Sequence, residues 1–134
     1  MSQENVEVVR RAIAAVNERD IDRYLSCCAD DVELSTPAVE IGGVYRGADG
    51  IRRFFADLGD TSPDFKLAIE RVEAIGTDRV LALLRVTSTG RASGLSAAAD
   101  MPTGNVYDLA DDKIQRIRIF LDRNEALEAA GLPE

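Results

Sequence analysis

The stretch that decides the fold is Asn105–Leu121, NVYDLADDKIQRIRIFL, which predicts two strands folded back on one another. β-Branched, aromatic and aliphatic residues fill both halves, and the polar break at residues 110–113 lies between two runs of strand length. One face of the second strand is apolar and the other mostly cationic, so the sheet that contains it has one covered side. The alternating residues are Ile117, Ile119 and Leu121 against Arg116, Arg118 and Phe120.

Two further alternating stretches precede this hairpin. In residues 64–75 the apolar positions change parity near Glu70-Arg71, which predicts a β-bulge and a strongly bent strand. Residues 76–78 predict a turn, and residues 79–89 predict the longest strand. Residues 90–104 contain three glycines and a proline with little periodicity, so we expect a loop or an irregular edge there.

The N-terminal half predicts helices and short strands. Apolar residues at three- and four-residue steps predict a helix from Glu4 to Arg19, and Asp20 can cap a short second helix that reaches Cys28. Residues 32–35 predict a strand, and residues 38–47 predict a loop with a brief strand around Val44-Tyr45. A third helix is expected over residues 49–58, ended by Gly59, and a last one over residues 124–130, capped by Asp122.

This order of elements predicts an α+β fold, because most helices precede a run of antiparallel strands and do not alternate with them. We expect one domain over residues 1–134, with helices packed on the concave face of a strongly bent antiparallel or mixed sheet. A sheet bent in this way and closed at one end by a long helix has a cone-shaped interior. Such an interior is a natural pocket for a ligand.

Composition excludes several classes of function. The net charge of −8 repels polyanions, so nucleic acid is not an expected partner. The absence of histidine excludes a Ser-His-Asp or Cys-His centre and histidine metal ligands, and we expect no metal site. Cys27 and Cys28 are adjacent and predict reduced thiols of the core.

Other expected properties follow from what the sequence lacks. No glycine-rich phosphate loop follows a strand and opens a helix, so no cofactor is expected. No apolar run is long enough for a membrane span, and residues 1–11 do not have the pattern of a secretory signal. We therefore expect no membrane partner and a cytoplasmic location.

Short segments along nearly the whole chain resemble the SnoaL-like branch of the NTF2-like superfamily. The segments are Val8–Arg11 with Ala15, Asn17 and Asp20; Asp30–Glu33; Gly43–Gly47 with Gly50–Arg52; Asp112–Ile114; and Asp122-Arg123 with Glu125–Leu132. This superfamily includes polyketide cyclases, ketosteroid isomerases and limonene epoxide hydrolase. The resemblance implies the NTF2-like cone fold, but members differ in activity, so function has to be argued from the pocket.

The resemblance also implies where chemistry is expected. In relatives that resemble ketosteroid isomerase, the catalytic base is a carboxylate just before the proline after the first strand, and Thr36 occupies that position here. A threonine hydroxyl cannot accept a proton at neutral pH, which argues against isomerase chemistry of that type. The hydrogen-bond donor of such sites corresponds to Asn105, with Tyr107 two positions later.

Two polar residues are weak catalytic candidates. Asp100 is expected at the mouth of the cone, either as an acid or base with a raised pKa or as a solvated loop residue. Asn105 could orient a ligand carbonyl or could satisfy neighbouring backbone groups. Arg116 and Arg118 could bind a carboxylated ligand, but their parity favours pairing with acidic groups on the outer sheet face.

These observations support three functional hypotheses. The first is binding of a small, mostly apolar molecule in the cone, and the alternative is an enzyme that acts through an enolate, like the cyclases or isomerases. The third is a module that dimerises through the outer sheet face, with Arg85, Thr87, Arg118 and Phe120 as contacts. The residues expected to bind the ligand are Leu34, Thr36, Phe55, Leu58, Leu84, Val86, Asn105, Tyr107, Ile117 and Ile119.

Overall fold

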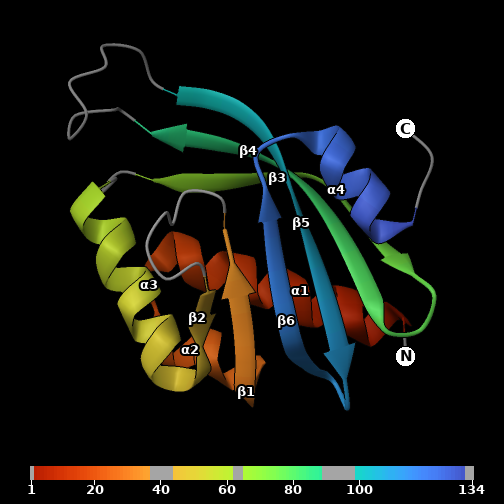
Figure 1. Ribbon diagram of the computed structural model, residues 1–134, viewed down its shortest axis with the longest axis horizontal. Helices are drawn as coiled ribbons and strands as arrows, with labels where there is room; N and C mark the ends of the chain where they lie inside the picture. The colour runs from red at the N-terminus through yellow and green to blue at the C-terminus, as the bar shows by residue number, and fades with distance from the viewer. Residues whose placement is uncertain (1, 37–43, 62–64, 89–98, 132–134) are drawn as a thin grey trace.

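The structure is a computed structural model that describes residues 2–36, 44–61, 65–88 and 99–131 (Figure 1). Its helices are α1 (Ser2–Glu18), α2 (Ile21–Ser26), α3 (Gly47–Thr61) and α4 (Arg123–Ala130). Its strands are β1 (Cys28–Ser35), β2 (Val44–Arg46), β3 (Lys66–Ile75), β4 (Arg79–Ser88), β5 (Ala99–Ala110) and β6 (Lys113–Phe120).

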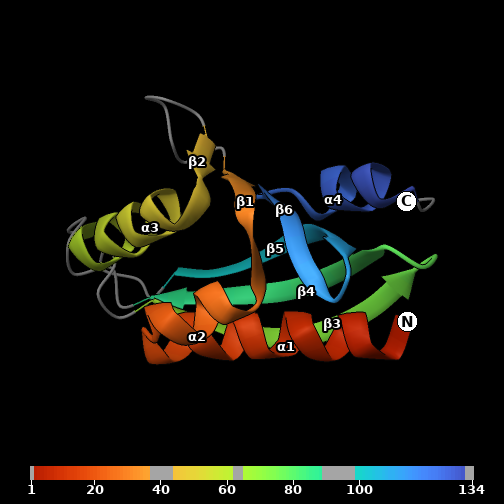
Figure 2. The ribbon, with the colours of Figure 1, turned by 90° about the horizontal axis from the view of Figure 1, so that it is seen from below.

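The strands form one open, mixed sheet in the order β2-β1-β6-β5-β4-β3. Neighbouring strands are antiparallel except β1 and β6, which are parallel. Figure 2 shows α1 and α2 along one side of the curved sheet, with α3 at its flank and α4 on the opposite side. The predicted α+β fold with a bent sheet is confirmed.

Two β-bulges interrupt antiparallel pairs of the sheet, and the parallel pair of β1 and β6 has a third register shift, between Cys28 and Glu33. The register between β3 and β4 shifts between Ile69 and Arg71, so Glu70 is the extra residue, as the sequence predicts. A second shift between Asp108 and Leu109 makes Gln115 the extra residue of β6. Because each bulge reverses the parity of the strand, apolar residues on both sides of it face the same core.

The hairpin of β5 and β6 is the one that the sequence predicts. Asp111 and Asp112 form its two-residue turn, and both have positive φ angles, of 53° and 63°. That geometry is a type I′ turn, whose twist matches the twist of the flanking strands. Aspartate tolerates the left-handed region better than most residues, which explains how this turn forms without glycine.

The end of α1 binds the free edge of β3. The side-chain amide of Asn17 donates to the carbonyl of Leu67 (2.9 Å) and accepts from its N–H (2.7 Å). Arg19 donates to the carbonyl of Phe65 (2.8 Å), and Lys66 Nζ donates to the carbonyl of Asn17 (2.8 Å). One amide side chain therefore takes the place of a neighbouring strand and fixes α1 against the sheet.

Several predicted boundaries are wrong. α2 ends at Ser26 and does not reach Cys28, which belongs to β1. β1 begins at Cys28 and not near residue 32, because Cys28 pairs with Ile114 of the parallel strand β6. α3 continues through Gly59 to Thr61; a helix stop of the left-handed type needs a positive φ angle, which Gly131 has and Gly59 does not. β5 begins at Ala99, so residues 99–104 are strand, whereas residues 90–98 lie outside the described residues.

The sheet carries a hydrophobic core on each face. The larger core joins the concave face to α1, α2 and α3. The smaller one joins the outer face to α4, so the prediction that the helices pack on the concave face fails for α4. Phe120, predicted to face solvent or a partner, packs in this second core, which is formed by Leu81, Val106, Ala126 and Ala130.

Replacement of Gly104 tests the contact between the sheet and α4. A Cβ atom at Gly104 would lie 2.5 Å from the Cβ of Ala126, which has no longer side chain to move aside. We expect Gly104→Ala to lower the free energy of unfolding by about 1–3 kcal/mol, measured by urea denaturation. Gly104→Ala combined with Ala126→Gly should recover part of the loss, and two additive losses would contradict this contact.

Gly59→Ala is the matched control. Nothing lies within 4 Å of a Cβ atom at Gly59, and the residue is inside α3. Alanine favours a helix over glycine by about 1 kcal/mol, so the same substitution should raise the free energy of unfolding here.

Candidate functional site

Three polar side chains follow one another along the concave face of β5. Thr103, Asn105 and Tyr107 alternate on this face, opposite Leu84, Ala82 and Val80 of β4. Their exposed fractions are 2%, 6% and 2%, so they are buried in an otherwise apolar core. We call these three residues the polar stripe.

Asn105 and Tyr107 are joined by a hydrogen bond. The amide Nδ2 of Asn105 donates to the Tyr107 hydroxyl oxygen at 3.1 Å. Burial raises the pKa of Tyr107 to about 12, and the hydrogen bond from Asn105 opposes this effect only in part. Tyr107 is therefore a neutral phenol at physiological pH, and its proton remains available for donation.

A second group of protic side chains lies behind Tyr107. The ring of Tyr24 packs edge-on against Phe55, with centroids 5.2 Å apart, and burial raises the pKa of Tyr24 well above its usual value. Burial also raises the pKa of the Cys28 thiol to about 12, with a further contribution from neighbouring Cys27. Both cysteines are free and buried, as predicted, and a thiol with such a pKa is a poor nucleophile.

The residues predicted to bind a ligand divide into two groups. Six are buried among the core side chains: Leu34, Phe55, Leu84, Asn105, Tyr107 and Ile117. The other four are only partly buried: Thr36, Leu58, Val86 and Ile119. These four lie at or near the ends of β1, α3, β4 and β6, which Figure 1 places toward one end of the sheet. These four residues are therefore the more accessible members of the predicted set.

The structure places the two positions that were considered for a catalytic base, Thr36 and Asp100, in different surroundings. Thr36 is partly buried immediately after β1, and it is not a carboxylate. Asp100 lies in β5, paired with Thr87, and not in a loop. Its position has the parity of Gly104, opposite to that of Asn105. Among the described residues, the buried polar side chains besides tyrosine and cysteine are Asn5, Thr103 and Asn105.

The polar stripe is held from the outer face by Arg123, the first residue of α4. Its guanidinium donates to the carbonyl of Leu84 (2.9 Å) and to that of Thr103 (3.3 Å). The same group pairs with the carboxylate of Glu70, the bulge residue of β3, which also pairs with Arg85 at 3.1 Å. Hydrogen bonds from these two arginines lower the pKa of Glu70.

Arg118, on the outer face of β6, is paired with an acidic residue, as its parity predicts, whereas the described residues show no ion pair for Arg116. Arg118 lies 3.7 Å from Asp108, which also pairs with Arg79 at 2.9 Å. Among the described residues, the buried Nε of Arg118 has no hydrogen-bond partner.

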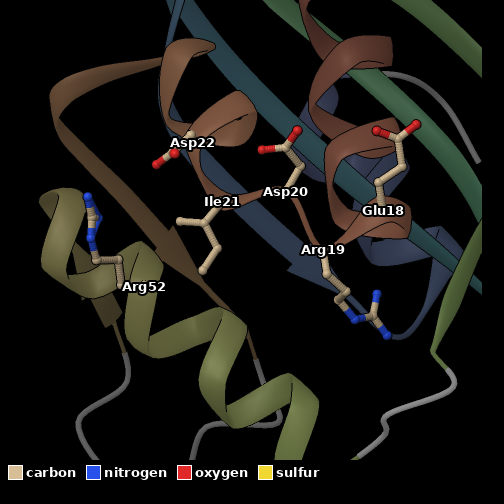
Figure 3. A pocket seen from close by; sticks show the side chains of 6 residues that line it. All are labelled: Glu18, Arg19, Asp20, Ile21, Asp22 and Arg52. Carbon is tan, nitrogen blue, oxygen red and sulfur yellow. The ribbon is translucent and has the colours of Figure 1, made fainter.

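Figure 3 shows a separate, shallow surface hollow between the joint of α1 with α2 and the start of α3. It is mostly polar. Arg19 lies in the turn between α1 and α2, and Arg52 lies on α3. Asp20 is committed to capping α2, because it accepts from the N–H of Arg23 at 3.1 Å. The residues that line this hollow are Glu18, Arg19, Asp20, Ile21, Asp22 and Arg52.

Sequence reasoning missed Thr103. It has the same parity as Asn105 and Tyr107, but the glycine and proline beside it suggested a loop. Gly104 is inside the strand because α4 packs against it, and Pro102 is paired with Arg85. In ranges 2–36, 44–61, 65–88 and 99–131, no group of three His, Cys, Asp or Glu side chains could hold a metal.

An alkaline titration tests the burial of the tyrosines. The pKa of Tyr107 and that of Tyr45 are raised to about 12, and Tyr24 is shifted in the same direction. The ultraviolet absorbance of tyrosinate should therefore be low near pH 10 in the native protein, but not in urea. Because the folded state favours the neutral phenols, the stability that they contribute is present below about pH 10 and is lost as the pH rises toward 12. Normal titration of a native tyrosine would contradict this assignment.

Comparison with known proteins agrees with this architecture. The family model of the SnoaL-like domain matches residues 9–117. An uncharacterised protein of Mycobacterium tuberculosis is 28% identical over 130 residues, which cover 93% of this chain and 94% of that protein.

Solved structures share the fold at lower identity. TerC, co-crystallised with polyporic acid, has a TM-score of 0.78 and 24% identity over 96% of this chain and 98% of its own. A protein of Jannaschia sp. CCS1, named as a SnoaL-like polyketide cyclase, has a TM-score of 0.76 and 21% identity over 99% of this chain and 95% of its own. With the family model matched over most of its length, this chain belongs to the SnoaL-like domain family and has the NTF2-like fold.

Proposed function

We propose that the protein binds a small, mostly apolar molecule at the open end of the cone. The observation that carries this proposal is the composition of the concave face. It is apolar except for the neutral polar stripe, and it is incompletely buried at Thr36, Leu58, Val86 and Ile119. An apolar surface with a few fixed polar groups is typical of small-molecule sites.

The described residues favour binding over proton-transfer chemistry. The buried side chains among them include no carboxylate and no lysine. Tyr107 and Cys28, which lie in the interior, have pKa values of about 12. A general base needs a pKa near the working pH, which none of these groups has. The named function of the Jannaschia protein and the polyporic acid co-crystallised with TerC support a small organic molecule as the occupant.

Within this site, Asn105 and Tyr107 orient the ligand. A ligand oxygen that reaches Asn105 meets an amide whose position is fixed by its hydrogen bond to Tyr107. Ile119 lies directly opposite Asn105 on β6 and supplies the apolar wall beside it.

Native mass spectrometry with lipophilic ketones, terpenoids and aromatic polyketides tests the proposal. Ile119→Trp places a larger ring at the open end and should lower affinity for a bound member of this panel about tenfold or more. Leu121→Trp is the control, because Leu121 is 48% exposed and lies just beyond β6. Its affinity should equal that of the wild type. Equal binding by the Ile119 and Leu121 variants would contradict the proposed place of the ligand.

We also propose that two copies associate through the outer sheet face, with contacts at Arg85, Thr87 and Arg118; Phe120, the fourth predicted contact, packs against α4 instead. One observation favours this surface: Leu121, next to Phe120, is a large apolar side chain that is 48% exposed.

Light scattering at micromolar concentration should then report a dimer. Arg118→Glu replaces a positive charge of the proposed interface by a second negative charge beside Asp108. We expect this variant to be a monomer, because the negative charges of the two copies would repel one another. Arg10→Glu, at an exposed position of α1, makes the same change of charge and should leave the dimer intact. A wild-type monomer, or equal effects of the two variants, would refute this surface.

A further inference from the structure

One row of charged residues crosses the outer face of the sheet. The strand register aligns Arg79 with Asp108, Asp108 with Arg116, and Arg116 with Glu33. Glu33 is in turn aligned with Arg46 of β2, so the charges alternate in sign across five neighbouring strands. The row therefore begins and ends with an arginine and has a third arginine at its centre.

Both carboxylates of this row are engaged by the arginines at its ends. Asp108 accepts a hydrogen bond from Nε of Arg79 at 2.9 Å, and the carboxylate of Glu33 lies 3.8 Å from Arg46. Arg116, at the centre, is exposed, and the described residues show no ion pair for it. The central cation of the row is therefore left without a close carboxylate.

Arg118 lies two residues along β6, faces the same side and is also incompletely paired. Its Nη2 lies 3.7 Å from Asp108, which is longer than a hydrogen bond. Its Nε is buried and has no hydrogen-bond partner among the described residues. Burial lowers the pKa of Arg118, Asp108 opposes this effect, and the nearby cations Arg116 and Arg79 strengthen it. Two guanidinium groups of one strand thus lie near each other and are short of negative charge.

This excess of positive charge indicates which kind of ligand would bind here. The four arginines at this place outnumber the two carboxylates by two, so a doubly charged anion would balance them. Guanidinium groups bind the oxygen atoms of phosphates and carboxylates through paired N–H donors. Ser35, which is aligned with Arg118 on β1, adds a hydroxyl group on the same face.

The outer side of β1 and β6 is accessible to such an anion. α4 packs against β4, β5 and β6, and Figure 1 shows it on the side of β6 away from β1. The other described helices pack in the concave core. The net charge of −8 repels an extended polyanion, but salt screens charges beyond about 8 Å, so a small anion responds mainly to the arginines beside it.

We propose that Arg116 and Arg118 form a binding site for a small, doubly charged oxyanion. The chemistry that the site recognises is two negative charges on oxygen atoms, which a phosphate and a dicarboxylate share. Arg116 supplies an exposed guanidinium, Arg118 a partly buried one, and Ser35 a neutral donor. The site lies on the face opposite to the proposed site for an apolar molecule, so it is a second and separate site.

Nuclear magnetic resonance titrations with inorganic phosphate and with succinate, at pH 8 and constant ionic strength, test the inference. We expect at least one of them to shift the backbone amide signals of Arg116 and Arg118 saturably, with a dissociation constant on the order of 1 mM. Chloride, which carries one charge, should cause no saturable shift. Tighter binding of phosphate would assign the site to phosphate groups, and tighter binding of succinate would assign it to dicarboxylates.

Three variants separate this site from a general effect of charge. Arg116→Gln should weaken binding of the dianion about tenfold, because it removes a charged hydrogen-bond donor from an exposed position. Asp108→Asn should strengthen binding about threefold, because it removes a negative charge beside the site. Arg11→Gln, at an exposed position of α1 on the other side of the sheet, is the matched control and should bind as the wild type does.

Either of two results would overturn the inference. The first is that the wild type binds neither dianion saturably, whichever oligomeric state light scattering reports for the same sample. The second is that Arg116→Gln and Arg11→Gln weaken binding equally. Neither result affects the proposal of an apolar ligand, because that ligand is assigned to the concave face and is tested with different molecules.

Discussion

The extra residue at Glu70 is the constraint on which the rest of the structure depends. Without the bulge, Leu67 and Val72 would face opposite sides of β3, and one half of the strand would expose its apolar residues. The bulge brings both halves to the same core and bends the strand. The carboxylate of Glu70 then pairs with Arg123, which also bonds to the carbonyl of Thr103 and so holds α4 on the outer face beside the polar stripe. One inserted residue therefore shapes the concave surface and also anchors the helix behind it.

The interior differs in kind from the outer face. On the outer face, Glu70 and Asp108 each pair with two arginines, so acidic groups there are paired with basic ones. The described concave side uses neutral groups, since the buried tyrosines and Cys28 keep their protons and the stripe consists of a hydroxyl, an amide and a phenol. The charged pairs therefore lie on the face opposite to the surface where an apolar ligand is proposed to bind.

Much of the fold could be predicted, because hydrophobic periodicity records which residues face the core. The hairpin, the bulge near Glu70 and the caps at Asp20 and Asp122 are all local patterns, and the structure confirms them. The errors arose where distant contacts override local preference. β1 starts early because β6 lies beside Cys28, and β5 starts early because β4 and α4 hold residues that would otherwise favour a loop.

The candidate site was predictable in part for the same reason. Asn105 and Tyr107 stood in a clear alternating stretch, whereas Thr103 was hidden behind Gly104. The identity of a ligand leaves no periodic signal in a sequence. It depends on which polar atoms face the binding surface once the chain has folded.

The amide of Asn17 has a consequence for how this protein meets other copies of itself. An exposed edge strand is an open template on which a sheet can grow from one molecule to the next. At Leu67 that template is already occupied, because the N–H and C=O of one peptide unit are taken by a side chain of the same molecule. The other edge, β2, is only three residues long. At Leu67 the edge of the sheet therefore offers no free peptide unit with which a strand of another copy could pair.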